Sequence, residues 1–126
     1  MKDPELDVLI KELETRADMT VADFDAVVHA LAFLLPEKAG DAAMPQVIST
    51  TDGAMVVADD AYPNWAVHIH GRANDRDGHW HCTLRENDSR DNDAVIGIGK
   101  SPVLAQAILA AVLRLAMALK KGPGST

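Results

Sequence analysis

Residues 65–85 read WAVHIHGRANDRDGHWHCTLR and predict a β-hairpin. In residues 65–70 and 79–85, apolar and β-branched side chains alternate with polar ones, which is the period of a half-buried strand. The stretch between these arms, residues 71–78, is polar and contains two glycines, as expected for a connecting turn. The hairpin therefore predicts an antiparallel sheet as the centre of the fold.

The alternation sorts the side chains of the hairpin onto two faces, because successive residues of a strand point to opposite sides. We expect Ile69 to lie opposite Trp80 on an apolar face that packs on helices. Cys82, the single cysteine of the chain, falls on the same face, which favours a buried thiol over a nucleophile paired with a histidine. The side chains expected to anchor this layer are Trp65, Ile69, Trp80 and Leu84.

The opposite face of the hairpin gathers four of the five histidines: His68, His70, His79 and His81. In the expected register, His70 faces His79 and His68 faces His81. The face is a solvated sheet surface, a Zn²⁺ site formed by the four imidazoles, or a partner-binding patch whose charge changes near the usual imidazole titration at about pH 6.5. A flat, open patch lacks the outer hydrogen bonds that hold metal-ligating imidazoles, which favours the solvated surface.

Two helices are predicted before the sheet. Apolar residues recur at helical spacing over residues 6–13, with Pro4 in the first turn. Thr20 and Asp23 then have the spacing of a capping box, and an apolar stripe follows that ends before Pro36. The stripe consists of Phe24, Val27, Val28, Leu31 and Leu35.

Further strands are expected on both sides of the hairpin. Residues 47–50 and 54–58 are predicted to pair across the turn at residues 51–53, and residues 94–98 to form one more short strand. The stretch ENDSRDND (86–93) is typical of a solvated acidic loop.

The segment SPVLAQAILAAVLRLAMAL (101–119) predicts a closing helix, with Ser101 as its N-cap and Pro102 as its first residue. Its buried stripe is expected to comprise Leu104, Ile108, Ala111, Leu115 and Leu119. A second set of small residues leaves room for another helix, so self-association is expected; this set is Ala105, Ala110 and Ala116.

The order of elements predicts an α+β fold: two N-terminal helices, a three- to four-stranded antiparallel meander and a long C-terminal helix packed on the sheet. We expect one domain of 126 residues. Its parts are a helical region (1–35), a linker loop (36–45), the antiparallel sheet (46–99), the C-terminal helix (101–121) and a disordered tail (122–126).

The composition restricts the class of partner. Twelve basic and 19 acidic residues give a formal net charge of −7, which opposes binding to nucleic acid. The single cysteine and the charged N-terminus indicate a cytoplasmic protein. Residues 103–119 are too short and too interrupted, by Gln106 and Arg114, to indicate a membrane span.

Enzyme and cofactor motifs are incomplete in this chain. Gly99-Lys100-Ser101 lacks the first glycine of a phosphate-binding loop, because position 94 is alanine. Asp75 and Asp77 match only part of a calcium-binding loop. The sequence therefore favours a non-enzymatic protein without a cofactor.

From Trp65 onward the chain resembles a family of small phage and bacterial proteins of unknown function that carry a phage-type α/β sandwich domain. The resemblance lies in NWAVHI, HWHCTL, a short acidic loop and SPVLAQAILAAVLRLA, and also in DFDAVVHALAFLL (23–35). The four histidines and residues 36–62 depart from the family. The resemblance implies an origin in a phage or mobile element and assigns no functional residue.

The function expected from the sequence is that of a small binding or regulatory protein that acts by protein–protein contact, with an acidic surface suited to a basic partner. One alternative is a metal-binding protein or metal-dependent hydrolase that uses Zn²⁺ on the histidine face. Another is an antitoxin-like regulator, since the hairpin, the next strand and the closing helix also resemble the partial RNase-H-like unit of one antitoxin type.

Overall fold

A computed structural model describes residues 3–35, 44–71, 80–85 and 96–121. The described elements run in the order α1 (Asp3–Thr15), the 3₁₀ helix η1 (Val21–Phe24), α2 (Asp25–Leu34), α3 (Pro45–Ile48), α4 (Thr51–Ala61), β1 (Ala66–His70), β2 (Trp80–Arg85), β3 (Ile96–Ser101) and α5 (Leu104–Lys121). Residues 36–43, 72–79, 86–95 and 122–126 lie outside the described part of the chain, and with them most of the predicted linker and turn and all of the predicted acidic loop and tail. The predicted linker (36–45) ends too late, because Pro45 is the first residue of α3.

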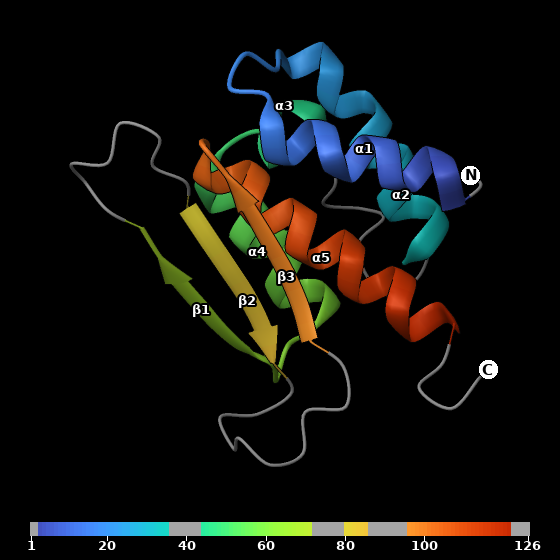
Figure 1. The fold of residues 1–126 in the computed structure, drawn as a ribbon, viewed down its shortest axis with the longest axis vertical. Coiled ribbons are helices and arrows are strands. Elements are labelled where there is room, and N and C mark those ends of the chain that lie inside the picture. Colours follow the sequence, from blue (N-terminus) through green and yellow to red (C-terminus); the bar gives the residue numbers. More distant parts are fainter. Residues whose placement is uncertain (1–2, 36–43, 72–79, 86–95, 122–126) are drawn as a thin grey trace.

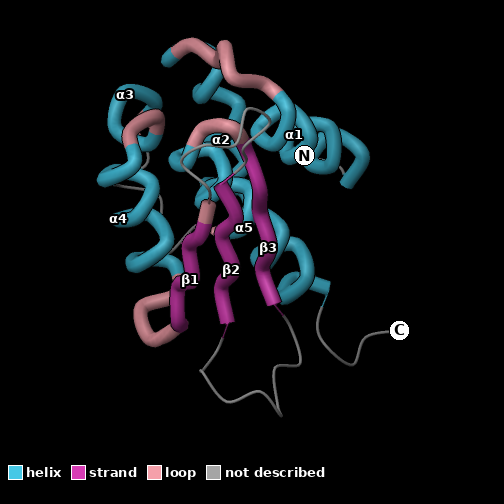
Figure 2. The backbone as a smooth tube through the Cα atoms, turned by 60° about the vertical axis from the view of Figure 1, so that its left-hand side comes forward, coloured by secondary structure: helices cyan, strands magenta, loops and turns pink. Residues whose placement is uncertain are grey.

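The predicted α+β class is confirmed. Within the described residues, β1, β2 and β3 form an antiparallel sheet in that order, and the long helix α5 packs on β2 and β3. Figure 1 shows α5 against the sheet, and Figure 2 shows the three strands in front with α5 behind them. The sheet therefore has one face covered by helix and one face turned away from it.

The two N-terminal helices form as the sequence predicts. The apolar positions of α1 that have the predicted helical spacing are buried: Leu6, Leu9, Ile10 and Leu13. The capping box is present, because the Thr20 hydroxyl accepts a hydrogen bond from the Asp23 amide and the Asp23 carboxylate accepts one from the Thr20 amide. This box begins η1, which leads directly into α2 and its buried stripe.

The strands predicted at 47–50 and 54–58 are wrong, because the first segment covers the end of α3 and the turn after it, and the second lies within α4. Pro45 occupies the first turn of α3, and the Thr50 hydroxyl caps α4 by accepting a hydrogen bond from the Gly53 amide at 3.0 Å. A Cβ at Gly53 would collide with the Val47 carbonyl, so glycine permits the close turn between the two helices. The buried residues of α4 have helical spacing: Ala54, Val57, Ala58 and Ala61.

The start predicted for the closing helix at Ser101 is also wrong. Ser101 is the last residue of β3, and α5 begins at Leu104. The Ser101 hydroxyl is buried and accepts hydrogen bonds from the Val103 amide and from Gln106. A side chain suited to capping a helix thus lies at the end of the preceding strand, where it accepts a hydrogen bond from a backbone amide in the connection to the helix.

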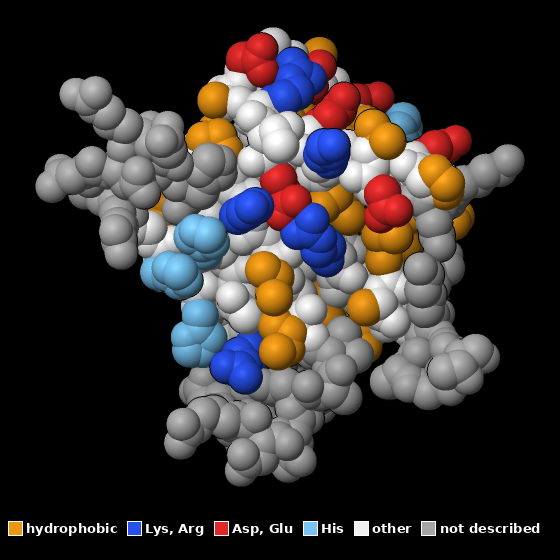
Figure 3. All heavy atoms as spheres, in the orientation of Figure 1, with side chains coloured by type: hydrophobic (Ala, Val, Ile, Leu, Met, Phe, Trp, Pro, Cys, Tyr) orange, Lys and Arg blue, Asp and Glu red, His pale blue; other side chains and the backbone are white. Residues whose placement is uncertain are grey.

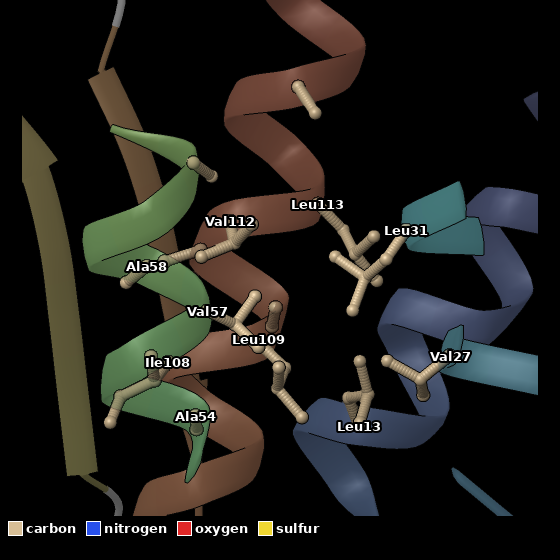
Figure 4. Close-up of a cluster of buried hydrophobic side chains, with 14 of the residues drawn as sticks. Leu13, Val27, Leu31, Ala54, Val57, Ala58, Ile108, Leu109, Val112 and Leu113 are labelled. Atoms are coloured by element: carbon tan, nitrogen blue, oxygen red, sulfur yellow. The ribbon is translucent and has the colours of Figure 1, made fainter. Parts of the chain in front are cut away.

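Helix α5 lies at the centre of the helical layer and is buried on several sides. Figure 4 shows it between α4, which contributes Val57 and Ala58, and the pair α1 and α2, from which Leu13 and Leu31 point toward it. The small residues expected to admit another helix from a second copy are buried within the chain: Ala105, Ala110 and Ala116. They therefore provide no free surface for self-association.

Two glycines bring β3 directly against α5. A Cβ at Gly97 would lie 2.6 Å from the Ala111 carbonyl oxygen, and a Cβ at Gly99 would lie 2.6 Å from the Ala111 amide nitrogen. Both distances are shorter than any side chain tolerates, so the strand approaches the helix backbone as only glycine allows. Because these glycines face the helix, the residues that alternate with them face away from it.

A buried polar cluster joins α1 to α5 and β3. The Gln106 amide is 2 % exposed and donates hydrogen bonds to the carbonyls of Leu13 and Arg16 at the end of α1. Glu14 is 8 % exposed and pairs with Arg114 of α5. The Gln106 amide thus satisfies carbonyls that the end of a helix leaves without an intrahelical partner.

Candidate functional site

The histidine strands pair in a register that differs by two residues from the predicted one. Ile69 lies opposite Cys82, and His70 lies opposite His81. The predicted pairs of Ile69 with Trp80 and of His68 with His81 are therefore wrong, although a shift of two leaves every side chain on its expected face. Trp80 instead lies beyond the end of β1 and packs over Gly71, where a Cβ would approach its ring to 2.9 Å.

The side chains predicted to anchor the apolar layer differ in their burial. Leu84 and Cys82 are fully buried, whereas Trp80 is 40 % exposed and Ile69 is 36 % exposed. Helix α5 packs on β3 and β2, so it covers the middle of the sheet more than the β1 side. Trp80 and Ile69 therefore border the core rather than anchor it.

Cys82 is buried as predicted. Its side chain lies on the helix side of β2, whereas the neighbouring His81 lies on the opposite face. Burial raises the pKa of the Cys82 thiol to about 11. A thiol that is protonated and covered in this way does not form a nucleophilic pair with a histidine.

The face of the sheet that points away from α5 is called the outer sheet face here. Its side chains form three rows across the strands, because paired residues of neighbouring strands lie side by side. The rows are His70, His81 and Lys100; His68, Thr83 and Ile98; and Ala66, Arg85 and Ile96.

The outer sheet face exposes two large aliphatic side chains. Ile98 is 52 % exposed and Ile96 is 37 % exposed, while Gly97 and Gly99 between and beside them are buried against α5. Strand β3 thus reverses the usual arrangement, in which apolar side chains face the core and small or polar ones face water. Sequence reasoning missed this pair, although two glycines at a period of two in IGIGK are a signal that the isoleucines face outward.

The charge of the outer sheet face is opposite to that of the chain. The three described strands contain Arg85, Lys100 and three histidines but no Asp or Glu, in a chain whose net charge is −7. Glu14, whose carboxylate accepts a hydrogen bond from the Lys100 amide, is buried and paired with Arg114. Figure 3 shows the resulting surface, with histidines and basic side chains beside the exposed hydrophobic ones.

The structure brings three of the four candidate metal ligands to this face: His68, His70 and His81. The rings of His70 and His81 are stacked, with centroids 4.9 Å apart and an interplanar angle of 11°. Nitrogen lone pairs lie in the ring planes, so parallel rings do not direct them toward one ion. No group of three or more His, Cys, Asp or Glu suited to a metal occurs among the described residues. His79 lies outside that part of the chain, and the four-histidine site stays a prediction.

Comparison of the chain with protein-family models, with curated proteins and with solved structures found no match. In the part of the chain that the structure describes, no helix combines the length and the apolar character required to cross a membrane.

Proposed function

We propose that this chain is a non-enzymatic binding protein that contacts another protein through the outer sheet face. The observation that carries the proposal is the exposure of Ile96 and Ile98 side by side on β3, framed by basic and histidine side chains. Protein interfaces combine such an apolar centre with a polar rim. The resemblance to the phage-type family favours a regulatory role inside the cytoplasm of a cell that carries a phage or mobile element.

The rigidity of β3 supports this proposal. The strand is held on one face by the contact of Gly97 and Gly99 with α5, and near its end by the bond from the Lys100 amide to Glu14. Because the backbone of such a strand is already ordered, little conformational entropy of the backbone is lost when a partner covers its side chains. Because each isoleucine is already partly covered, its complete burial contributes about 1 kcal/mol.

The proposal is tested by affinity capture from host cells, with the Ile98→Ser variant compared with the wild-type chain. We expect a specific partner to be retained by the wild type and lost from the variant. Val56 on α4 is 48 % exposed, so Val56→Ser is a matched control that removes a similar exposed aliphatic side chain elsewhere. Equal retention by both variants would contradict the proposed face.

Two further candidates have specific support. The order β1, β2, β3 and α5 corresponds to the strand–strand–strand–helix unit of the antitoxin type, and a toxin as the captured partner would favour that function. The presence of His68, His70 and His81 on one face supports a Zn²⁺-binding function. Equimolar zinc that survives dialysis, and that is lost in the His70→Gln variant, would favour the metal site over the protein-binding face.

A further inference from the structure

We infer that the outer sheet face recognises an acidic protein segment in which a carboxylate side chain lies beside an aliphatic one. The inference rests on the proposed function and adds the chemistry of the partner. It also reverses the expectation of a basic partner, because the described strands that form this face contain Arg85 and Lys100 but no Asp or Glu.

Charge complementarity favours an acidic partner for the outer sheet face. Lys100 carries a fixed positive charge at one end of the outer sheet face, in the same row as the imidazoles of His70 and His81. The described strands contain no carboxylate that would oppose an approaching anion. The rest of the chain is strongly acidic and repels an acidic partner, so such a partner is directed to this face.

The spacing of the side chains on β3 matches that of an extended peptide. Lys100, Ile98 and Ile96 alternate with the buried residues of β3, so they follow one another on the same face. Alternate residues of a strand are about 7 Å apart, which equals the spacing of alternate residues in an extended peptide. An extended segment with a carboxylate two positions from an aliphatic residue therefore places the first on Lys100 and the second on Ile98.

The chemistry of the outer sheet face favours an acidic protein over a nucleic acid. Non-specific binding of single strands depends on aromatic side chains on which bases stack, and on a strongly positive groove. The centre of the outer sheet face is aliphatic, and Trp80 lies on the opposite face of β2. Aliphatic residues and isolated basic groups suit a protein segment better than a phosphate backbone.

The test uses the full chain and a fluorescent peptide that repeats Glu-Ser-Leu-Ser, so that Glu and Leu alternate on one side. We expect it to bind in fluorescence anisotropy, with amide shift changes centred on β3. A peptide with Gln in place of Glu should bind about tenfold more weakly, and added salt should weaken the Glu peptide. Lys100→Glu should abolish binding, with Lys100→Gln as a milder second variant.

The matched control is Lys11→Glu, which makes the same change in net charge at an exposed position on α1. It should bind the Glu peptide as the wild type does. Equal binding of the Gln peptide, equal loss in the Lys11→Glu variant, or no peptide binding at all would overturn the acidic-partner inference. Tighter binding of a thymidine oligonucleotide at β3 would also overturn it and indicate a nucleic-acid ligand. A different result contradicts the proposed function: in the affinity capture, the Ile98→Ser variant retains every partner that the wild-type chain retains.

Discussion

Arg114 of α5 and Glu14 of α1 lie 100 positions apart in the chain and form a two-pronged ion pair, in which Arg114 Nη2 donates to Glu14 Oε1 at 2.6 Å and Nη1 donates to Oε2. Arg114 Nη1 also donates to the Ile98 carbonyl at 2.8 Å, and the Lys100 amide donates to Glu14 at 3.2 Å. The pair therefore connects the first helix, the last helix and the strand that carries the proposed binding face. Its hydrogen bonds to Glu14 raise the pKa of Arg114.

Removing the charge of Glu14 should destabilise the fold. Glu14→Gln leaves Arg114 without its carboxylate, and because Arg114 stays partly solvated the expected loss is about 1–3 kcal/mol in the free energy of unfolding. Urea denaturation followed by circular dichroism measures it. Asp18→Asn, which breaks the exposed pair of Asp18 with Arg16, is the control and should leave the midpoint unchanged. An equal shift in both variants would show that the buried pair has no special role.

Adding one methyl group at Gly99 should be costly, because its Cβ would enter the backbone of α5 at Ala107 and Ala111. We expect Gly99→Ala to lower the free energy of unfolding by about 2–3 kcal/mol, since neither the strand nor the helix backbone shifts easily. Gly71→Ala is the control, because it meets the partly exposed side chain of Trp80 instead. Thermal denaturation of both variants measures the loss of stability. A smaller loss for Gly99→Ala than for Gly71→Ala would contradict the close packing of β3 on α5.

Replacing Gln106 with methionine should loosen the end of α1. The variant keeps the side-chain volume but removes the donor that satisfies the carbonyls of Leu13 and Arg16. An unsatisfied buried carbonyl costs about 1–3 kcal/mol, so the midpoint of urea unfolding should fall accordingly. Hydrogen exchange should also become faster in the last turn of α1, and unchanged protection there would count against this role.

The stability of the fold should decline in alkaline solution. The pKa of Cys82 is raised by burial from 9.0 to about 11, and that of Tyr62 is raised by burial from 10.0 to about 12. The unfolded chain therefore releases both protons at lower pH than the folded chain does, and each group disfavours folding as pH rises through this window. Cys82→Ala should flatten the decline between pH 9 and pH 11, measured by urea unfolding, and an unaltered slope would contradict the assignment to Cys82.

The binding tests require that exposed residues be replaceable without unfolding. Ile98 is 52 % exposed, so Ile98→Ser should change the free energy of unfolding by less than about 1 kcal/mol. Leu84 is fully buried on the other face of the sheet, and Leu84→Ala should cost about 2–5 kcal/mol. Thermal melts of the two variants measure this contrast, and a large loss in Ile98→Ser would mean that the outer sheet face contributes to folding.

Local pattern was sufficient for much of the fold. The helical spacing of residues 6–13, the capping box at Thr20 and the two-residue alternation of the histidine strands each depend on near neighbours, and each is observed. The prediction of two strands within residues 47–58 was wrong, because a short apolar run fits a strand or a helix equally well. The Thr50 cap and the spacing of Ala54, Val57 and Ala61 decide it in favour of helix.

The sequence by itself determined which residues share a face of each strand, since side-chain parity depends only on position along the strand. It therefore predicted that Cys82 is buried and that His68, His70 and His81 lie together. Only the tertiary structure decided the pairing of β1 with β2, which is shifted by two residues from the predicted register. It also decided which face of β3 meets the helix. That face is the one with Gly97 and Gly99, because only glycine lets the strand approach the backbone of α5 so closely, and Ile96 and Ile98 are therefore left on the opposite face.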